Sequence, residues 1–191
     1  RVNAGCSGHQ VGASQLLTDL LDVSRLQAGV LAISSTRVDP AAVVLAAVEE
    51  LELSAAEVDL DLDAMDAAAS TDVLADPVLL QRVLVNVLAN ARRHSPPDAR
   101  VRIATSAFAG RVEVRIVDHG PGIPADRRDE VFVPFQRLGD TDNTTGLGLG
   151  LALSRGFVEG MGGTLEAEDT PGGGLTMVVT LHAADAAQEP A

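Results

Sequence analysis

Apolar residues recur with the period of an α-helix in several parts of the chain. In the first of them Leu16, Leu17, Leu20 and Leu21 fall on one helical face, and Gly29 is expected to end the helix. Two further helices each begin at an Asp-Pro pair, in which the aspartate caps the N-terminus and the proline fits the first helical position. The patterns predict helices over 16–28, 39–53, 76–94 and 149–161.

The first predicted helix needs a partner to cover its apolar stripe. It either packs on its own domain or is the end of a longer helix from a dimeric bundle. Residues 1–15 show no apolar period, and we expect them to be a disordered lead-in or a cloning remnant. The tail over 184–191 is also expected to be disordered.

Strand patterns lie between the helices. Val58, Leu60 and Leu62 alternate with aspartates, which predicts a half-buried strand, and two later segments read as hairpins with glycine-containing turns. Because antiparallel hairpins are mixed with helices, we expect an α+β sandwich, in which one mixed, mostly antiparallel sheet is covered on one face by helices. Strands are predicted over 58–62, 72–75, 101–105, 112–117, 165–168 and 175–182.

Composition limits the functions that this fold can serve. Of the 191 residues, 46% are hydrophobic and 2% aromatic, so the core must be built from aliphatic side chains. The formal net charge of −13 argues against nucleic acid as a partner, because binding it requires a basic face. An anionic ligand would need a metal ion, an arginine or backbone N–H groups. Cys6 is the single cysteine, which excludes a disulfide within the chain.

Two asparagines on the third predicted helix form the first candidate for chemistry. Asn86 and Asn90 are one helical turn apart and share a face, with Arg93 about one turn further on. An amide oxygen can coordinate a hard cation, and an amide NH₂ can donate to a phosphate. Taken alone, such a pair is more often two polar residues that face solvent.

A loop that opens with Asp118 is the second candidate. It follows a predicted strand, and Gly120 and Gly122 would let a ligand come close to the backbone. A buried carboxylate only accepts hydrogen bonds, so it would favour the exocyclic amine of adenine over the carbonyl of guanine. Turns of this kind also occur for purely structural reasons.

Alternating glycines before the last predicted helix are the third candidate. Gly146, Gly148 and Gly150 expose successive N–H groups at a helix N-terminus, which can hold a phosphate. The segment is neither a Walker A loop, because no Gly-Lys-Ser/Thr follows, nor a dinucleotide fingerprint, because no strand directly precedes it.

The fourth candidate lies between these glycines and the Asp118 loop. Phe132 and Phe135 are expected to anchor the base of a mobile loop over 134–145, in which Arg137 is placed to reach phosphate oxygens.

In order and spacing, the four clusters resemble the N, G1, F and G2 boxes of the ATP-binding domain of bacterial sensor histidine kinases. The resemblance covers about 16–181 and implies the Bergerat (GHKL) sandwich shared with gyrase, Hsp90 and MutL. Residues 20–29, LLDVSRLQAG, resemble the end of the second helix of the kinase dimerisation domain. The implied division is therefore a dimerisation-helix remnant over 16–29 and an ATP-binding domain over 30–183. Within the family, the C-terminal motifs look most like the potassium-sensing KdpD type.

The resemblance also implies roles for individual residues. Asn90 would ligate Mg²⁺, Asn86 would contact the phosphates or a metal-bound water, and Arg93 stands near the phosphates where the family often has lysine. Asp118 would bind the adenine amine in a pocket shaped by Gly120, Gly122 and Ile123. The triphosphate would be wrapped by a lid over 134–145 and by the glycine segment, with contacts from Arg137, Thr144, Thr145, Gly146, Leu147, Gly148, Leu149 and Gly150.

The activity implied is the binding of Mg-ATP and transfer of its γ-phosphoryl group to a histidine of the dimerisation domain in a two-component system. Hydrolysing members of the fold carry a glutamate general base where Asn86 stands, and an amide cannot take up a proton. The alternatives left open are a Bergerat-fold ATPase, a serine-kinase anti-sigma factor and a degenerate interaction module.

The phosphoacceptor motif is missing from the sequence, so we expect a fragment that binds ATP but does not phosphorylate itself. The implied partners are ATP, the dimerisation domain and a cognate response regulator. The whole protein is expected to be a homodimer in the bacterial inner membrane, with this domain in the cytoplasm.

Overall fold

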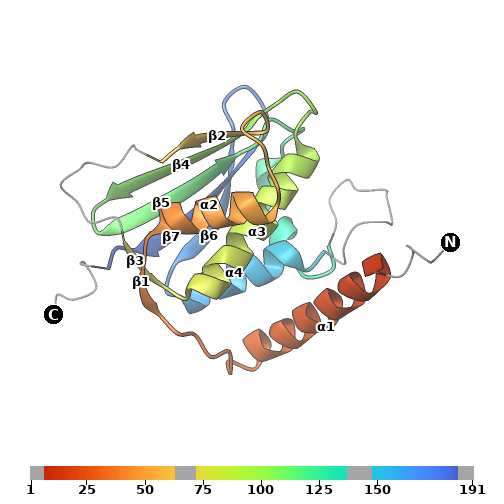
Figure 1. Cartoon of the computed structure of the whole chain (residues 1–191), viewed down its shortest axis with the longest axis vertical. Helices are drawn as coiled ribbons and strands as arrows, with labels where there is room; N and C mark the ends of the chain where they lie inside the picture. The colour runs from red at the N-terminus through yellow and green to blue at the C-terminus, as the bar shows by residue number, and fades with distance from the viewer. Residues whose placement is uncertain (1–6, 63–71, 137–147, 185–191) are drawn as a thin grey trace.

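The computed structural model describes residues 7–62, 72–136 and 148–184, with side chains from residue 16 onward within these ranges (Figure 1). Its elements are α1 (Ser7–Gln27), β1 (Thr36–Val38), α2 (Pro40–Glu50), β2 (Val58–Asp61), β3 (Val73–Ala75), α3 (Pro77–His94), β4 (Val101–Phe108), β5 (Arg111–Val117), the 3-10 helix η1 (Ala125–Phe132), α4 (Gly150–Gly160), β6 (Thr164–Asp169) and β7 (Leu175–His182). None of the helices within these ranges combines the length and the hydrophobicity that a membrane-spanning helix requires.

A five-stranded sheet in the order β2-β4-β5-β7-β6 forms one layer. β2 runs parallel to β4, and every other neighbouring pair is antiparallel. The helices α2, α3 and α4 lie on one face of this sheet (Figure 1). The predicted α+β sandwich is therefore confirmed. A second, two-stranded sheet pairs β3 with β1, a strand that is too short for its period to be visible in the sequence.

The helix α3 occupies the middle of the helical layer, because it packs against both α2 and α4. Its apolar face is completely covered, and the aliphatic core predicted from composition surrounds it. The residues of this face are Leu79, Leu80, Val83, Leu84, Val87, Leu88 and Ala91, all at most 8% exposed. Burial of this face fixes the rotation of α3 about its axis, and so the direction of its polar side chains.

Aspartate caps set the start of α2 and α3, as the Asp-Pro pairs predict. Oδ1 of Asp39 accepts a hydrogen bond from the N–H of Ala41 at 2.9 Å. Oδ1 of Asp76 accepts from two N–H groups of the first turn of α3, at 3.0 and 3.2 Å. Oδ2 of Asp76 also accepts from the N–H of Ser34 at 3.0 Å. Asp76 therefore ties the segment after α1 to the beginning of α3.

The other end of α3 is tied to β2 through Glu57. The carboxylate of Glu57 accepts hydrogen bonds from the N–H and Oγ of Ser54 and from Nε of Arg92, which together lower its pKa from 4.5 to about 2. Because the pKa is lowered in the folded chain, this contact favours folding at neutral pH. The effect is lost as the pH falls from 4.5 toward about 2.

The first helix differs from the expectation in its length. α1 begins at Ser7, so residues 7–15, which were expected to be disordered, are helical. It packs on α4, while Leu17, Leu20 and Leu21 remain 65%, 41% and 57% exposed. The predicted apolar stripe is real, but most of it stays uncovered within the described residues. The assignment of 16–29 to a dimerisation helix stays a prediction.

Replacing Asp76 by alanine should lower the free energy of unfolding more than replacing Asp39. The Asp39 cap is worth about 1 kcal/mol, whereas loss of Asp76 should cost about 2 kcal/mol, because the hydrogen bond to Ser34 is lost as well. Urea unfolding of the two variants and the parent, followed by circular dichroism, measures the difference. Equal losses would show that the contact with Ser34 contributes nothing.

Candidate functional site

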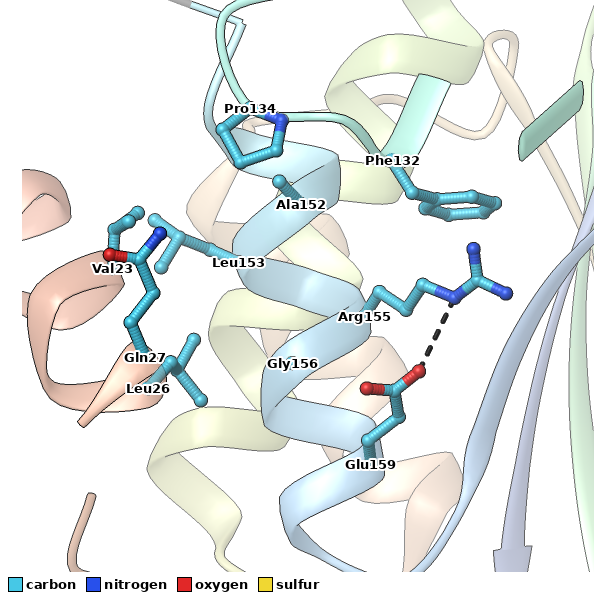
Figure 2. A pocket seen from close by; sticks show the side chains of 10 residues that line it. All are labelled: Val23, Leu26, Gln27, Phe132, Pro134, Ala152, Leu153, Arg155, Gly156 and Glu159. Atoms are coloured by element: carbon cyan, nitrogen blue, oxygen red, sulfur yellow. Dashed lines mark ion pairs between the residues drawn. The ribbon is translucent and has the colours of Figure 1, made fainter. Parts of the chain in front are cut away.

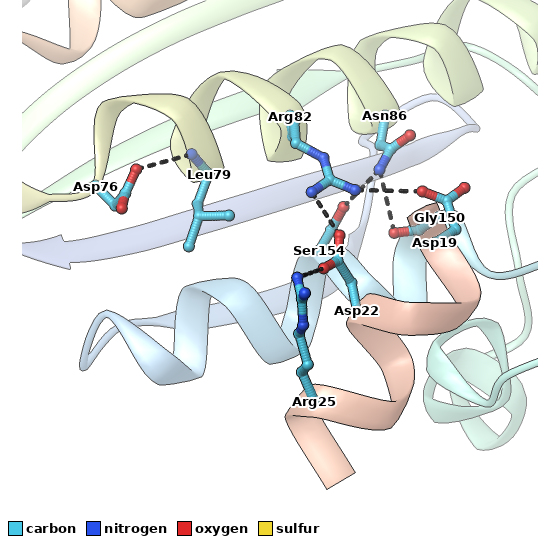
Figure 3. A network of polar contacts seen from close by, with 9 residues as sticks. All are labelled: Asp19, Asp22, Arg25, Asp76, Leu79, Arg82, Asn86, Gly150 and Ser154. Carbon is cyan, nitrogen blue, oxygen red and sulfur yellow. Dashed lines mark hydrogen bonds and ion pairs between the residues drawn. The ribbon is translucent and has the colours of Figure 1, made fainter. Parts of the chain in front are cut away.

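The two asparagines of α3 are half-buried, and both have their NH₂ groups bound to the protein. Nδ2 of Asn86 donates to the carbonyl oxygen of Gly150 and to Oγ of Ser154, each at 3.4 Å (Figure 3). Nδ2 of Asn90 donates to the carbonyl oxygen of Asn86 at 2.9 Å. A carbonyl oxygen can only accept, so these contacts fix which way each amide is turned. Within the described ranges these are the side-chain hydrogen bonds of both residues, so Oδ1 of each can accept a hydrogen bond or bind a cation.

The start of α4 lies directly beside Asn86. Gly148 has a φ of +71°, and a methyl group there would come within 2.9 Å of the carbonyl oxygen of Gln136. A methyl group on Gly150 would come within 3.3 Å of Oδ1 of Asn86. Leu149, which is 2% exposed, anchors the segment in the core. The first and third candidate clusters of the sequence therefore meet in the structure.

Asp118, at the end of β5, is 5% exposed, and its two carboxylate oxygens differ in their hydrogen bonding. Oδ1 accepts hydrogen bonds from the N–H groups of Gly120 and Leu175, both at 2.9 Å. Among the described residues, the side-chain hydrogen bonds of Asp118 all end on this oxygen. Oδ2 is therefore the atom that can accept from a ligand.

Glycines allow the Asp118 loop to lie against two other parts of the backbone. A methyl group on Gly120 would come within 2.5 Å of the carbonyl oxygen of His94, at the end of α3. Gly174 has a φ of +117°, and a methyl group there would overlap the carbonyl oxygen of Asp118. Gly122, with a φ of +68°, lies against Gly174 in turn. Only glycine fits at these close approaches.

The second half of α3 connects these groups into one strip. Asn86 adjoins Gly150, His94 adjoins Gly120, and Asn90 lies between them on the same helix. The two ends of the strip are about 12 Å apart along the helix axis. A ligand that contacts both ends must therefore be extended.

The remaining predicted residues are less closely tied to this strip. Arg93 is exposed on α3, and Ile123 is half-buried against the core. Five further residues lie outside the described ranges, namely Arg137, Thr144, Thr145, Gly146 and Leu147.

The prediction that two phenylalanines anchor the loop after η1 is correct for Phe132 and wrong for Phe135. Phe132 is 8% exposed, with the guanidinium of Arg155 4.5 Å from its ring centroid (Figure 2). Phe135 is 61% exposed, and its backbone N–H donates to the carbonyl oxygen of Gly148 at 3.1 Å. Its backbone, rather than its ring, holds this segment in place.

Two contributors to the site were not recognised in the sequence. Ser154 is fully buried and contacts Asn86, and a polar residue on the apolar face formed by Leu153 and Phe157 could have indicated it. The N–H of Leu175 holds Asp118 from the neighbouring strand β7. No local sequence pattern predicts that contact, because it depends on strand pairing.

A divalent cation bound here would have to use ligands other than a cluster of carboxylates, although the chain is acidic. In the described residues there is no group of three His, Cys, Asp or Glu side chains that could hold a metal ion. The oxygens of Asn86 and Asn90 are hard neutral ligands that suit Mg²⁺, which commonly takes its other ligands from phosphates and water. The donor set therefore fits a cation that arrives with a phosphorylated ligand.

Comparisons with known proteins point the same way. A family model described as Histidine kinase-, DNA gyrase B-, and HSP90-like ATPase matches residues 75–185. The chain is 64% identical over 173 residues to the sensor protein KdpD of Rathayibacter rathayi, covering 91% of this chain and 20% of that protein. It is 44% identical over 174 residues to KdpD of Mycobacterium tuberculosis H37Rv, covering 88% of this chain and 20% of that protein. The chain thus spans about a fifth of the length of these relatives.

A solved structure supports the assignment independently. The crystal structure of full-length ShkA in complex with AMPPNP matches with a TM-score of 0.71 and 28% identity, over 89% of this chain and 36% of that chain. The predicted fold and the predicted resemblance to histidine kinases are both confirmed. Given its sandwich, the matched family model and these relatives, the chain belongs to the family of histidine kinase-, DNA gyrase B- and HSP90-like ATPases.

Proposed function

We propose that the chain is the ATP-binding, catalytic domain of a KdpD-type sensor histidine kinase. It binds Mg-ATP and transfers the γ-phosphoryl group to a histidine of a dimerisation domain. One observation carries the proposal: a buried carboxylate, two free amide oxygens and a glycine-lined helix N-terminus lie along one strip of α3. The carboxylate suits the amine of a base, the amide oxygens suit a cation, and the helix N-terminus suits phosphates.

The adenine end of the nucleotide is assigned to Asp118. Oδ2 accepts a hydrogen bond from the exocyclic amine of adenine, while Oδ1 stays bound to the backbone. Guanine presents a carbonyl oxygen in place of that amine and is repelled by the carboxylate. Gly120 and Gly122 keep the loop close to α3, and Ile123 borders the same pocket.

The phosphate end is assigned to the start of α4. Backbone N–H groups at Gly148 and Gly150 and the helix dipole attract the phosphates. Leu149 holds this turn in the core. The proposal also includes contacts from the predicted lid over 134–145 and from Arg137, Thr144, Thr145, Gly146 and Leu147, and these five residues lie outside the described ranges.

The two asparagines would hold the cation. Oδ1 of Asn90 would ligate Mg²⁺ and Oδ1 of Asn86 would bind the ion or one of its waters, while Arg93 would add positive charge near the phosphates. When bound, the ion neutralises the charge of the phosphates and orients them. The chain carries a net charge of −13, so this neutralisation favours the binding of a triphosphate.

Transfer to histidine is favoured over hydrolysis by the chemistry of Asn86. An amide cannot remove a proton from water, so the site lacks the general base that a hydrolase has at this position. An imidazole nitrogen attacks the γ-phosphorus, the bond to the β-phosphate oxygen breaks, ADP leaves and the imidazole loses its proton to solvent. Positioning and charge stabilisation suffice for such a step.

The partners follow from this role. The phosphoacceptor histidine belongs to the dimerisation domain, and the phosphoryl group passes from it to a response regulator. In the whole protein the domain works in the cytoplasm as part of a homodimer held in the bacterial inner membrane.

Replacing Asp118 by asparagine should abolish the preference for adenine. Oδ1 keeps both backbone hydrogen bonds, whereas an NH₂ group replaces Oδ2 and opposes the adenine amine. We expect the dissociation constant of Mg-ATP to rise at least tenfold, about 1.4 kcal/mol, and that of Mg-GTP to fall, because the NH₂ group can donate to the guanine carbonyl. Calorimetric titration measures both nucleotides, with the exposed Asp98→Asn variant as control. Unchanged ATP affinity would rule out this role.

Replacing Asn90 by alanine should weaken the binding of Mg-ATP at least tenfold, and that of ATP in EDTA less than twofold. The difference is expected because the amide oxygen acts on the cation rather than on the nucleotide itself. Gln81→Ala is the control, because Gln81 is a half-buried residue of the same helix whose side chain contacts Glu50 rather than the strip. Equal losses with and without Mg²⁺ would assign Asn90 to the nucleotide instead.

Supplying a KdpD-type dimerisation domain in trans tests the activity as a whole. We expect labelled phosphohistidine on the added domain in the presence of γ-labelled ATP, with steady-state release of phosphate remaining slow without that domain. Rapid release of phosphate by the chain alone, without any phosphohistidine in the mixture, would identify a hydrolase.

A further inference from the structure

Arg82 stands at the point where three helices meet. It lies on α3, one turn before Asn86, and its guanidinium contacts two carboxylates of α1 (Figure 3). Nη1 is 2.7 Å from Oδ2 of Asp22, and Nη2 is 3.2 Å from Oδ1 of Asp19. The same guanidinium lies 5.0 Å from the ring centroid of Phe157 on α4. One side chain therefore links α1, α3 and α4.

The ion pairs of Arg82 are sheltered from water. The side chain of Asp22 is 7% exposed and that of Arg82 is 28% exposed. Solvent screens charges in such a position only weakly. Removing one partner leaves the other charge buried without it, which is strongly destabilising. Arg25 also contacts Asp22, at 3.5 Å, but it belongs to α1 and is 58% exposed. Arg25 therefore adds nothing to the contact between the helices.

Glycines on α4 receive the apolar side of α1. A methyl group on Gly156 would come within 2.7 Å of Cδ1 of Leu26, and one on Gly160 would come within 2.5 Å of Cδ1 of Ile33. Glycine inside a helix is unfavourable compared with alanine, so Gly156 indicates a surface that accommodates α1, while Gly160, at the end of α4, lies against the segment after α1. Leu26 thus sits against α4 while Arg82 holds α1 to α3.

The apolar contact between α1 and α4 is incomplete. An open cleft of about 290 Å³ remains between the two helices (Figure 2). It is lined by Val23 and Leu26 of α1, by Leu153 and Gly156 of α4 and by Phe132, among others. Because apolar packing alone is limited here, the ion pairs of Arg82 carry a large share of the contact between α1 and the rest of the chain.

The contacts between α3 and α4 continue from Arg82 toward the nucleotide strip. Arg82 faces Phe157, and one turn further along α3, Asn86 faces Ser154 and Gly150. The two hydrogen bonds of Asn86 are long, at 3.4 Å each, so they depend on how closely α3 and α4 approach each other. A contact that holds α3 and α4 close together would therefore fix the position of the Asn86 amide.

We propose that Arg82 is a positioning residue for the nucleotide site. By binding Asp19 and Asp22 it holds α1 across α3 and α4, and this clamp sets Asn86 opposite Gly150. The proposal rests on the assignment of this strip to Mg-ATP. Docking of α1 and binding of Mg-ATP then strengthen each other by the same factor, because linkage between two equilibria is reciprocal.

The decisive variant changes α1 and leaves α3 and α4 intact. Asp19→Asn combined with Asp22→Asn removes both charges at nearly constant size. We expect the dissociation constant of Mg-ATP to rise at least fivefold, within the usual range of coupling between sites. Arg25→Gln is the matched control, since it removes a cation from the same carboxylate without touching α3. It should change the constant less than twofold.

A second variant tests the same clamp without altering any charge. Gly156→Leu blocks the place of Leu26 on α4, and leucine is well tolerated in a helix. It should weaken Mg-ATP binding in the same way. Amide hydrogen exchange supplies the readout that a purely structural role would not give. Mg-ATP should slow exchange in α1 of the parent chain and should fail to do so in both variants.

The outcomes separate the inference from the proposed function. If α1 exchanges faster in both variants while Mg-ATP affinity is unchanged, the clamp has no effect on the site and the inference is wrong. If the control Arg25→Gln weakens binding as much as the double variant, Arg82 is not the link. Failure of the parent chain to bind Mg-ATP would refute the proposed function and the inference together.

Discussion

The structure depends first on the burial of one face of α3. The residues of that face, among them Leu80, Leu84 and Leu88, are enclosed between the sheet and the neighbouring helices. Because the rotation of the helix is fixed in this way, Asn86 and Asn90 must lie on its open side. The same helix ends at His94, against which the Asp118 loop packs. A single buried helix therefore places both ends of the nucleotide strip.

The site also shows how an acidic chain can receive a polyanion. Its net charge of −13 would repel a triphosphate, and the strip along α3 is built largely from neutral groups. Amide oxygens suit a cation, and backbone N–H groups at the start of α4 suit phosphates. The one carboxylate in the strip, Asp118, stands at the far end, where a base amine rather than a phosphate is expected.

The position of α1 extends this account beyond the nucleotide. Part of the helix is held by Arg82 and by the glycine surface of α4, while Leu17, Leu20 and Leu21 remain exposed. A helix that is packed on one face and exposed on another can contact partners on both faces. Its contact with α3 lies one turn from Asn86, so a change in α1 has a short route to the site.

The sequence by itself determined much of what depends on neighbours along the chain, although it missed β1 and the helical residues 7–15. The Asp-Pro pairs set the starts of α2 and α3, sequence patterns revealed the strands of the five-stranded sheet, and motif spacing identified the family. Tertiary structure alone decided which oxygen of Asp118 is free, because the N–H of Leu175 comes from another strand. It likewise turned the amide of Asn86, joined Arg82 to Asp22 and left Phe135 exposed. Local patterns reflect backbone preference and burial, whereas these contacts arise only when distant segments are brought together by the packing of the core.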